Sequence, residues 1–290
     1  MATDCITTIG SSLIQHGPLN DRVYLMKLSA PDAAAIVPEL DALASAEGYS
    51  KIFAKVPAGS VMQFLAAGYR IEARVPGFFK GDEDGFFLGK YFSQDRRRSA
   101  DPGIEEVVAC ALACAGERRP ARPAPAWQIT EAGPADANDL AALYGQVFET
   151  YPFPIADPRY IRETMTDNVR YFIVRHEGTL IGASSAEMDL PSMNAEMTDF
   201  ATLPAFRGQG ISSCLLRHME QAIQPEGIRT AFTIARAAYP PVNILFARAG
   251  YRFAGTLVNN TSICGSFESM NVWYKPLDGP SGRRSAGLSL

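Results

Sequence analysis

Residues 200–213 constrain the fold of this chain more than any other stretch. An apolar strand ends in a short loop with two glycines, and the run Ile211–Ile223 that follows has apolar residues at helical spacing. Small residues let backbone N–H groups converge and a helix start adds partial positive charge, so this order suits a phosphate site. The spacing Arg207-x-x-Gly210-x-Ser212 differs from the nucleotide-binding P-loop and from the dinucleotide fingerprint. An ordinary strand-to-helix turn is the alternative.

Length and composition narrow the class of protein. A chain of 290 residues exceeds one average domain, so we expect two. A net charge of -4 gives no general attraction to nucleic acid or to an anionic membrane. No apolar run reaches the roughly 20 residues of a membrane-spanning helix, and the first residues lack the basic start and apolar core expected of a secretion signal. Five cysteines without framework spacing indicate reduced thiols, so we expect a cytoplasmic protein with no metal site.

Four segments differ in their patterns. Residues 1–93 are predicted to form a domain, with strands at 23–28, 52–56, 71–75 and 85–92 and helices at 31–46 and 61–67. Residues 94–126 combine a polar break with solvated arginines, a helix at 104–115 and a proline-rich linker. Residues 127–277 form the second predicted domain, and 278–290 a flexible tail.

The second predicted domain has the more regular pattern. Its expected strands are 127–130, 170–176, 180–188, 195–203, 230–235, 251–258 and 269–275, and its expected helices are 135–148, 158–165, 211–223 and 241–249.

Two stretches of the chain, 47–70 and 226–252, resemble each other. In both, a helix precedes Glu-Gly, a strand follows, and a short helix ends at Gly-Tyr before another strand. The first stretch has no Arg-Gly-x-Gly ahead of its helix. We interpret it as a degenerate copy of the second; the alternative is a coincidence of two common helix–strand units.

The glycine loop resembles the pyrophosphate loop of the GNAT acetyltransferases, written Arg/Gln-x-x-Gly-x-Gly/Ala, which holds acetyl-CoA. Ser212 departs from the last position but is small and keeps its N–H. Residues 127–275 resemble a complete GNAT domain, and longer strings resemble the β-lysine N-acetyltransferases, which make the compatible solute Nε-acetyl-β-lysine. These strings are Tyr151-Pro-Phe-Pro, Ser184-Ser-Ala-Glu-Met-Asp, Asn194-Ala-Glu-Met-Thr-Asp-Phe-Ala-Thr-Leu-Pro, Asn259-Asn-Thr and Glu268-Ser-Met-Asn-Val-Trp-Tyr-Lys.

The resemblance implies an α/β (α+β) GNAT fold, with a mixed central sheet flanked by helices and a smaller degenerate GNAT-like domain before it. It implies acetyl-CoA as co-substrate, lying along the strand before the loop. The cofactor residues that it implies are Phe200, Ala201, Thr202, Leu203, Arg207, Gly208, Gln209, Gly210, Ile211, Ser212, Asn243 and Phe246. For Asn243, a helix cap is the alternative role.

Acetyl transfer to an amine requires a base, because an alkylammonium with a pKa near 10.4 is no nucleophile at neutral pH. By resemblance, Glu196 is the first choice. Asp199 is the second, and strand alternation predicts that it lies on the opposite face. Glu187 on the neighbouring strand is the third, and this acid cluster would attract a cationic diamine. The alternative is a structural role, in which each of these carboxylates pairs with an arginine or accepts a hydrogen bond from a backbone N–H group.

Many relatives carry a tyrosine that acts as the general acid, and the matching position here is Phe246, which has no proton to give. Tyr239 and Tyr251 are possible substitutes. Polar groups at strand ends give the candidate substrate residues Tyr151, Glu187, Asn194, Asn259, Asn260 and Asn271, with ordinary turn chemistry as the alternative for each asparagine. We expect the substrate's carboxylate on the Asn259-Asn260 or Tyr151 side.

Three functions remain open at this stage. The first is acetylation of the side-chain amine of β-lysine, and the second is acetylation of another small amine such as lysine, a polyamine or an aminoglycoside. The third is a non-catalytic acetyl-CoA-binding or scaffolding protein. We expect a small-molecule partner, no nucleic acid or membrane, and a possible homodimer.

Overall fold

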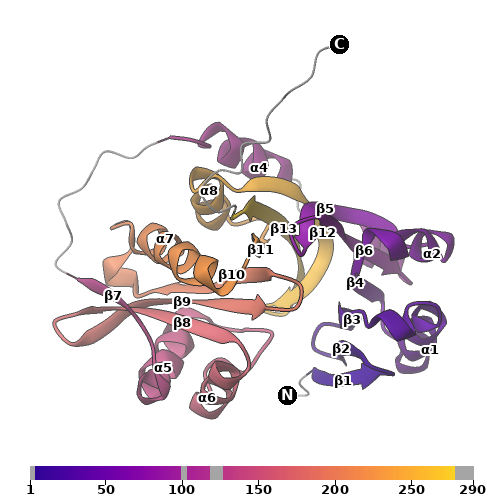
Figure 1. Ribbon diagram of the computed structural model, residues 1–290, viewed down its shortest axis with the longest axis horizontal. Helices are drawn as coiled ribbons and strands as arrows, with labels where there is room; N and C mark the ends of the chain where they lie inside the picture. Colours follow the sequence, from indigo (N-terminus) through magenta and orange to yellow (C-terminus); the bar gives the residue numbers. More distant parts are fainter. Residues whose placement is uncertain (1–3, 99–102, 118–126, 278–290) are drawn as a thin grey trace.

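The computed structural model describes residues 4–98, 103–117 and 127–277, in which thirteen strands form one sheet (Figure 1). The predicted linker at 116–126 and tail at 278–290 lie wholly or largely outside these ranges. The strand order is β1-β2-β3-β4-β6-β5-β12-β13-β11-β10-β9-β8-β7. No helix in the described ranges is long and apolar enough to cross a membrane.

The first half of the chain supplies one end of the sheet. Its strands are β1 (Cys5–Ile9), β2 (Ser12–Gly17), β3 (Arg22–Lys27), β4 (Lys51–Pro57), β5 (Arg70–Phe79) and β6 (Glu83–Tyr91). Its helices are η1 (Ala30–Asp32), α1 (Ile36–Glu47), η2 (Ala58–Ser60) and α2 (Val61–Ala66), followed by α3 (Gln94–Arg97) and α4 (Ile104–Ala113).

The second half supplies the other end. Its strands are β7 (Gln128–Glu131), β8 (Val169–His176), β9 (Thr179–Asp189), β10 (Asn194–Thr202), β11 (Thr230–Arg236), β12 (Arg252–Ile263) and β13 (Ser266–Pro276). Its helices are η3 (Pro134–Asp136), α5 (Ala137–Val147), α6 (Pro158–Thr166), η4 (Pro204–Phe206), α7 (Ile211–Ile223), η5 (Gln224–Glu226) and α8 (Pro240–Arg248).

The two halves repeat one strand topology. In the first, β1, β2 and β3 are antiparallel, β4 is parallel to β3, and β6 and then β5 follow antiparallel. In the second, β8, β9 and β10 are antiparallel, β11 is parallel to β10, and β13 and then β12 follow antiparallel. Strand β7 is an extra edge in the second half. The repeat seen in the sequence therefore corresponds to a repeated arrangement of strands, while the exact division at residues 93 and 127 stays a prediction.

Side-chain packing repeats as well. In each half, a tyrosine that follows Gly packs edge-on against a phenylalanine, with ring centroids 5.0 Å and 4.9 Å apart. A lysine ammonium lies near the tyrosine ring and pairs with a carboxylate at 2.6 Å in the first half and 2.7 Å in the second. These groups are Phe64, Tyr69, Lys90 and Asp41 in the first half and Phe246, Tyr251, Lys275 and Glu220 in the second.

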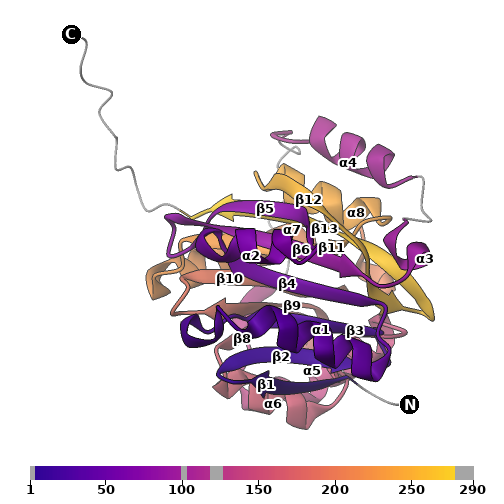
Figure 2. The same cartoon turned by 90° about the vertical axis from the view of Figure 1, so that its right-hand side faces the viewer.

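Helices cover one face of the first half and both faces of the second, and part of the uncovered sheet surface of the two halves meets in a shared core. Helices α1 and α2 pack on the side of the first half that faces away from the second (Figure 2). In the second half, α7 and α8 cover one face of the sheet and α5 and α6 the other, while α4 packs against α8. The shared core between the halves holds Tyr24, Phe53, Phe78 and Phe87 from the first and Phe232, Leu257, Met270 and Val272 from the second.

The sequence patterns do not predict β1, β2 or α3. Strand β1 is an edge with little burial (Ile6 is 51% exposed), so it lacks the alternation that reveals a half-buried strand. The arginines of 96–98 are predicted to be solvated, and for Arg96 this is wrong. Its side chain is buried, and the guanidinium donates to the carbonyls of Asn20 and Asn259, each at 2.8 Å.

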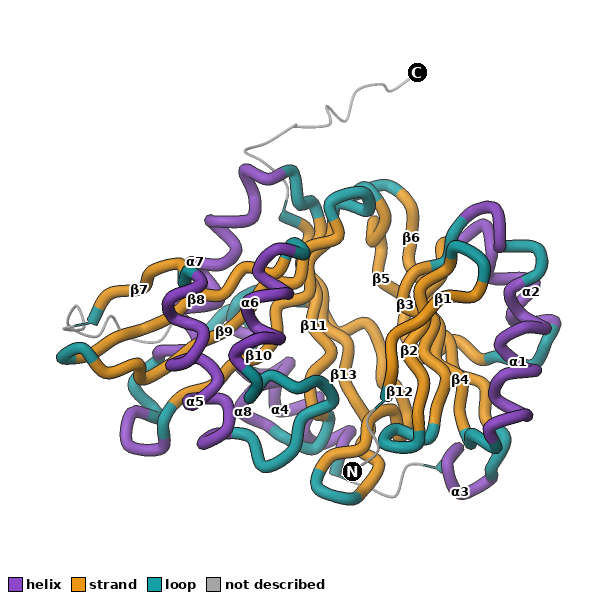
Figure 3. The backbone as a smooth tube through the Cα atoms, turned by 90° about the horizontal axis from the view of Figure 1, so that it is seen from below, coloured by secondary structure: helices purple, strands orange, loops and turns teal. Residues whose placement is uncertain are grey.

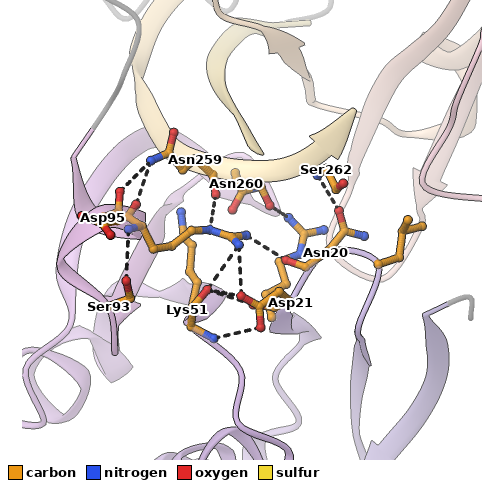
Figure 4. Close-up of polar contacts among 12 residues, drawn as sticks. Asn20, Asp21, Lys51, Ser93, Asp95, Asn259, Asn260 and Ser262 are labelled. Atoms are coloured by element: carbon orange, nitrogen blue, oxygen red, sulfur yellow. Dashed lines mark hydrogen bonds and ion pairs between the residues drawn. The ribbon is translucent and has the colours of Figure 1, made fainter. Parts of the chain in front are cut away.

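The halves join where β5 meets β12, through Gly255 opposite Ala73. Figure 3 shows the strands of both halves side by side on the two sides of this junction. Beyond it, pairing of β12 with β13 is interrupted between Leu257 and Thr261, and the freed backbone turns toward the first half. There the Lys51 ammonium donates to the Val258 carbonyl at 2.7 Å and to Glu72 at 3.0 Å, within a buried polar cluster (Figure 4).

Gly255 allows the close approach at this junction. Its φ is +147°, and a Cβ would lie 2.1 Å from the Glu72 carbonyl oxygen. We expect Gly255→Ala to lower the free energy of unfolding by about 3 kcal/mol, because backbone would have to move apart. Gly68→Ala is the matched control: φ is +89° and nothing lies within 4 Å of its Cβ, so strain of about 1 kcal/mol is expected. Equal losses in urea denaturation would contradict the close junction.

Candidate active site

The sheet opens between β10 and β11. These parallel strands pair over only three positions, 194–196 with 230–232. Beyond that point β10 stays paired with β9 and β11 with β13, so the two facing edges separate. A cavity of about 1990 Å³ opens at this gap, lined by both halves of the chain. Beyond this point the two facing edges have no strand partner across the gap, so an extended ligand can pair with their backbone groups.

A β-bulge shapes β10 at the gap. The register with β9 shifts between Thr198 and Ala201, and Asp199 has a φ of +55°. Its carboxylate accepts hydrogen bonds from the Ser185 hydroxyl at 2.5 Å and from the Tyr151 hydroxyl. Ser185 lies two residues from Glu187, on the same face of β9, so Asp199 reaches the face that holds the other acids. The predicted opposite-face position of Asp199 is therefore wrong, because simple alternation fails at a bulge.

Glu196 and Glu187 lie directly opposite each other on β10 and β9, and both line the cavity. The pKa of Glu196 is raised to about 7, chiefly by burial; the nearby Lys55 ammonium opposes the shift and the Asp199 carboxylate adds to it. The pKa of Glu187 is raised as well, by burial within the walls of the cavity and then by the charge of Glu196. The Ile234 N–H is hydrogen bonded to Glu196 and favours its ionised form.

The first half forms a wall of the cavity opposite these acids. Lys55 on β4 places its ammonium 5.4 Å from the ring centroid of Tyr24 and 5.5 Å from that of Phe232. Burial lowers the pKa of Lys55, but interactions with Tyr24 and Glu196 outweigh burial and the pKa is raised. Sequence reasoning missed these wall residues. The available signal was a lysine inside the otherwise apolar strand 52–56, with no charge nearby in sequence to pair with it.

The glycine loop lies at the other end of the cavity. Gly208 and Gly210 have φ values of +78° and +87°, which favour glycine, and a Cβ on either would meet nothing within 4 Å. Gly210 caps α7, whose first-turn N–H groups have no partner within the helix. Open space in front of left-handed glycines and a helix start is the arrangement that phosphate binding needs, so the loop fits the pyrophosphate of acetyl-CoA.

The predicted cofactor residues divide into two groups. Phe200, Thr202, Arg207, Gly208, Gln209, Gly210, Ile211 and Ser212 line the cavity. The side chains of Ala201, Leu203, Asn243 and Phe246 do not. Phe246 is fully buried between Phe200 and Tyr251, so its predicted cofactor contact is wrong.

Asn243 is a buried structural hub. Its amide nitrogen donates to the carbonyls of Arg236 and Tyr239, each at 2.9 Å. Its oxygen accepts from the side chains of Asn271 and Trp273, again at 2.9 Å. All its hydrogen-bonding capacity is used inside the fold, so neither the predicted cofactor contact nor the helix cap describes its role.

The predicted substrate residues also divide. Tyr151, Glu187 and Asn260 line the cavity. Asn194 instead donates to the Phe78 carbonyl at 3.1 Å, and Asn259 to the carbonyls of Arg96 and Arg98 at 2.9 Å and 2.7 Å.

Asn271 is bonded to Asn243. For Asn194, Asn259 and Asn271 the predicted substrate contact is wrong, because tertiary hydrogen bonds use their amides. Asn194 and Asn259 bond to the first part of the chain, and Asn271 bonds within the second half. Of the two tyrosines considered as acids, Tyr239 lines the cavity and Tyr251 lies in the core.

Comparison with known proteins agrees with this geometry. Residues 138–251 match the model of the Acetyltransferase (GNAT) family. The chain is 39% identical over 270 residues to the β-lysine N(6)-acetyltransferase of Methanococcus maripaludis, covering 93% of this chain and 98% of that one. It is 31% identical over 272 residues to the N-acetyltransferase YodP of Bacillus subtilis, covering 92% and 96%.

A solved structure, the ribosomal-protein-S18-alanine N-acetyltransferase of Escherichia coli, matches 54% of this chain and 97% of its own with a TM-score of 0.48 and 15% identity. The 39% identity to the Methanococcus maripaludis enzyme extends over nearly the full length of both chains. Together with the GNAT family match, it confirms the resemblance to the β-lysine N-acetyltransferases and the GNAT fold expected from the sequence. The chain is a member of the β-lysine N(6)-acetyltransferase family, within the GNAT acetyltransferases.

Proposed function

We propose that this protein transfers the acetyl group of acetyl-CoA to the terminal amine of β-lysine. One observation carries the proposal: a single cavity joins the glycine loop to a cluster of buried carboxylates. The first end suits a pyrophosphate and the second a cationic amine. The name of the archaeal relative supports β-lysine as the amine.

The cofactor end is assigned to the loop and the open strand edges. The N–H groups of residues 208–212 and the start of α7 would hold the pyrophosphate. The unpaired edge of β10 beyond Glu196 would pair with the pantetheine amides. When bound, acetyl-CoA supplies a thioester whose acetyl group is activated for transfer.

Glu196 is assigned as the base. It lines the cavity at the point where β10 and β11 separate, next to the free strand edges. Its raised pKa narrows the gap to the alkylammonium pKa of about 10.4, which eases removal of the amine proton. Asp199 already accepts two hydroxyl hydrogen bonds, so we assign it to holding Tyr151 and to attracting the cation. Glu187 faces Glu196 and adds to that attraction.

The pyrophosphate assignment is tested at Gly210. Gly210→Val puts a branched side chain into the open space in front of the loop and strains a left-handed backbone position. We expect calorimetric binding of acetyl-CoA to be lost while the protein stays folded. Gly178→Val is the matched control, because Gly178 also has a φ of +80° with nothing within 4 Å but lies in the β8–β9 turn outside the cavity. Unchanged affinity in Gly210→Val would exclude this loop.

The base assignment is tested by Glu196→Gln. We expect the rate at neutral pH to fall by roughly 10²-fold, the usual scale for loss of a general base. In the wild type, kcat/KM should rise with pH through about 7, because a raised pKa leaves Glu196 protonated below that pH. The variant should lose this rise and recover part of its rate at high pH, where free amine is present. A near-normal Glu196→Gln together with an inactive Asp199→Asn would transfer the assignment to Asp199.

The substrate assignment is tested with a panel of amines. We expect kcat/KM to be higher for β-lysine than for α-lysine, because the distal amine differs in position and buried partners would be left unpaired. Spermidine and aminoglycosides should be poor substrates. A polyamine with the highest kcat/KM would overturn β-lysine and leave an acetyltransferase for another amine; release of no thiol with any amine would indicate a non-catalytic protein.

A further inference from the structure

Arg22 is a buried cation that reaches the cavity and, among the described residues, forms no ion pair, although the charge of Asp4 acts on it from farther away. It lies on β3, is 5% exposed and lines the cavity. Its Nη1 donates to the Asn260 carbonyl, and its Nε is buried with no hydrogen-bond partner. Burial lowers the pKa of Arg22 to about 10, so the charge is costly where it stands.

Two other buried cations of this junction are paired. Lys51 lies 3.0 Å from Glu72, and Arg96 lies 3.5 Å from Asp21. In the part of the chain that the structure describes, Arg22 makes no such ion pair. A guanidinium that is desolvated, unpaired and open to a cavity is suited to bind a carboxylate that enters from outside.

The strand spacing on β3 is of the same size as the substrate. Arg22 and Tyr24 point to the same face of β3, about 6.6 Å apart along the strand, and Tyr24 is beside Lys55 near the acid cluster. In extended β-lysine the reacting nitrogen and the carboxylate carbon are separated by six bonds, about 7 Å. With the amine at Glu196, the carboxylate can reach the Asn260 side of the cavity.

We propose that Arg22, from the half of the chain without the glycine loop, binds the carboxylate of the amino-acid substrate and so selects amino acids over simple diamines. The inference rests on the proposed function, and it makes the degenerate half the part that determines specificity. No covalent step is assigned to Arg22. Its contribution is to binding, so its loss should raise KM more than it lowers kcat.

The test compares β-lysine with 1,4-diaminopentane, which keeps both amines and their spacing but lacks the carboxylate. For the wild type we expect kcat/KM to be about 10- to 100-fold higher for β-lysine, the scale of a charge-assisted hydrogen bond. Arg22→Gln should remove most of this ratio by lowering kcat/KM for β-lysine alone. Arg22→Lys should keep part of it.

Arg96→Gln is the matched control, because Arg96 is a buried arginine of the same junction that does not line the cavity. It should lower the unfolding midpoint without changing the substrate ratio. A wild-type ratio near one, or a ratio unchanged in Arg22→Gln, overturns the inference and leaves the proposed function standing. If Arg22→Gln does not fold, the inference is judged from the kcat/KM ratio of the two compounds in the wild type and in Arg22→Lys. Acetylation of neither compound by the wild type overturns the proposed function itself.

Discussion

Three buried carboxylates held close together in one cavity are the constraint on which the rest of this structure depends. Like charges in a site of low dielectric raise one another's pKa, and each ionised group is costly unless it has partners. Asp199 is stabilised by two hydroxyl donors, which the bulge in β10 brings within reach. Glu196 is stabilised by the Ile234 N–H, which is available because β10 and β11 have separated. The gap in which we propose that acetyl-CoA binds therefore also provides the donor that stabilises Glu196, the proposed base.

The repeated topology explains why the wall that the first half forms has the same strand arrangement as the acid-bearing half but carries different side chains. Tyr24 pairs with Phe53 across the parallel β3–β4 junction, as Glu196 pairs with Phe232 across β10–β11. Tyr24 thus occupies in the first half the position that Glu196 has in the second, and Lys55 corresponds in the same way to Ile234. Around the acid cluster, the second copy supplies the three carboxylates, and the first supplies Arg22, Tyr24, Phe53 and Lys55. The first copy has no glycine loop before α1, which agrees with a wall rather than a second transfer site.

The sequence predicted the elements that depend on local pattern. Helix α7 begins and ends where its periodicity indicates, and the loop before it contains the two glycines expected to let backbone N–H groups converge. Features that depend on tertiary contacts were missed. Nothing local reveals that Asn243 is bonded to Asn271 and Trp273, that Asn259 is bonded to the carbonyls of α3, or that Asp199 lies in a bulge. The wall was missed for the same reason, because Arg22 and Lys55 meet the acids only when the two halves face each other.

Charge balance links the two walls to the class of ligand. Other charged residues also line the cavity, but the acid cluster and the wall opposite it can be counted by themselves. With all five groups ionised, Glu187, Glu196 and Asp199 against Arg22 and Lys55 leave one negative charge there. β-Lysine at neutral pH carries two ammonium groups and one carboxylate, and its single net positive charge would neutralise that excess. A polyamine would bring more positive charge than these groups can neutralise, and it has no carboxylate for Arg22 to bind. α-Lysine has the same net charge as β-lysine, so charge alone does not separate these two, and the discrimination must come from where the cavity places acceptors for the second amine.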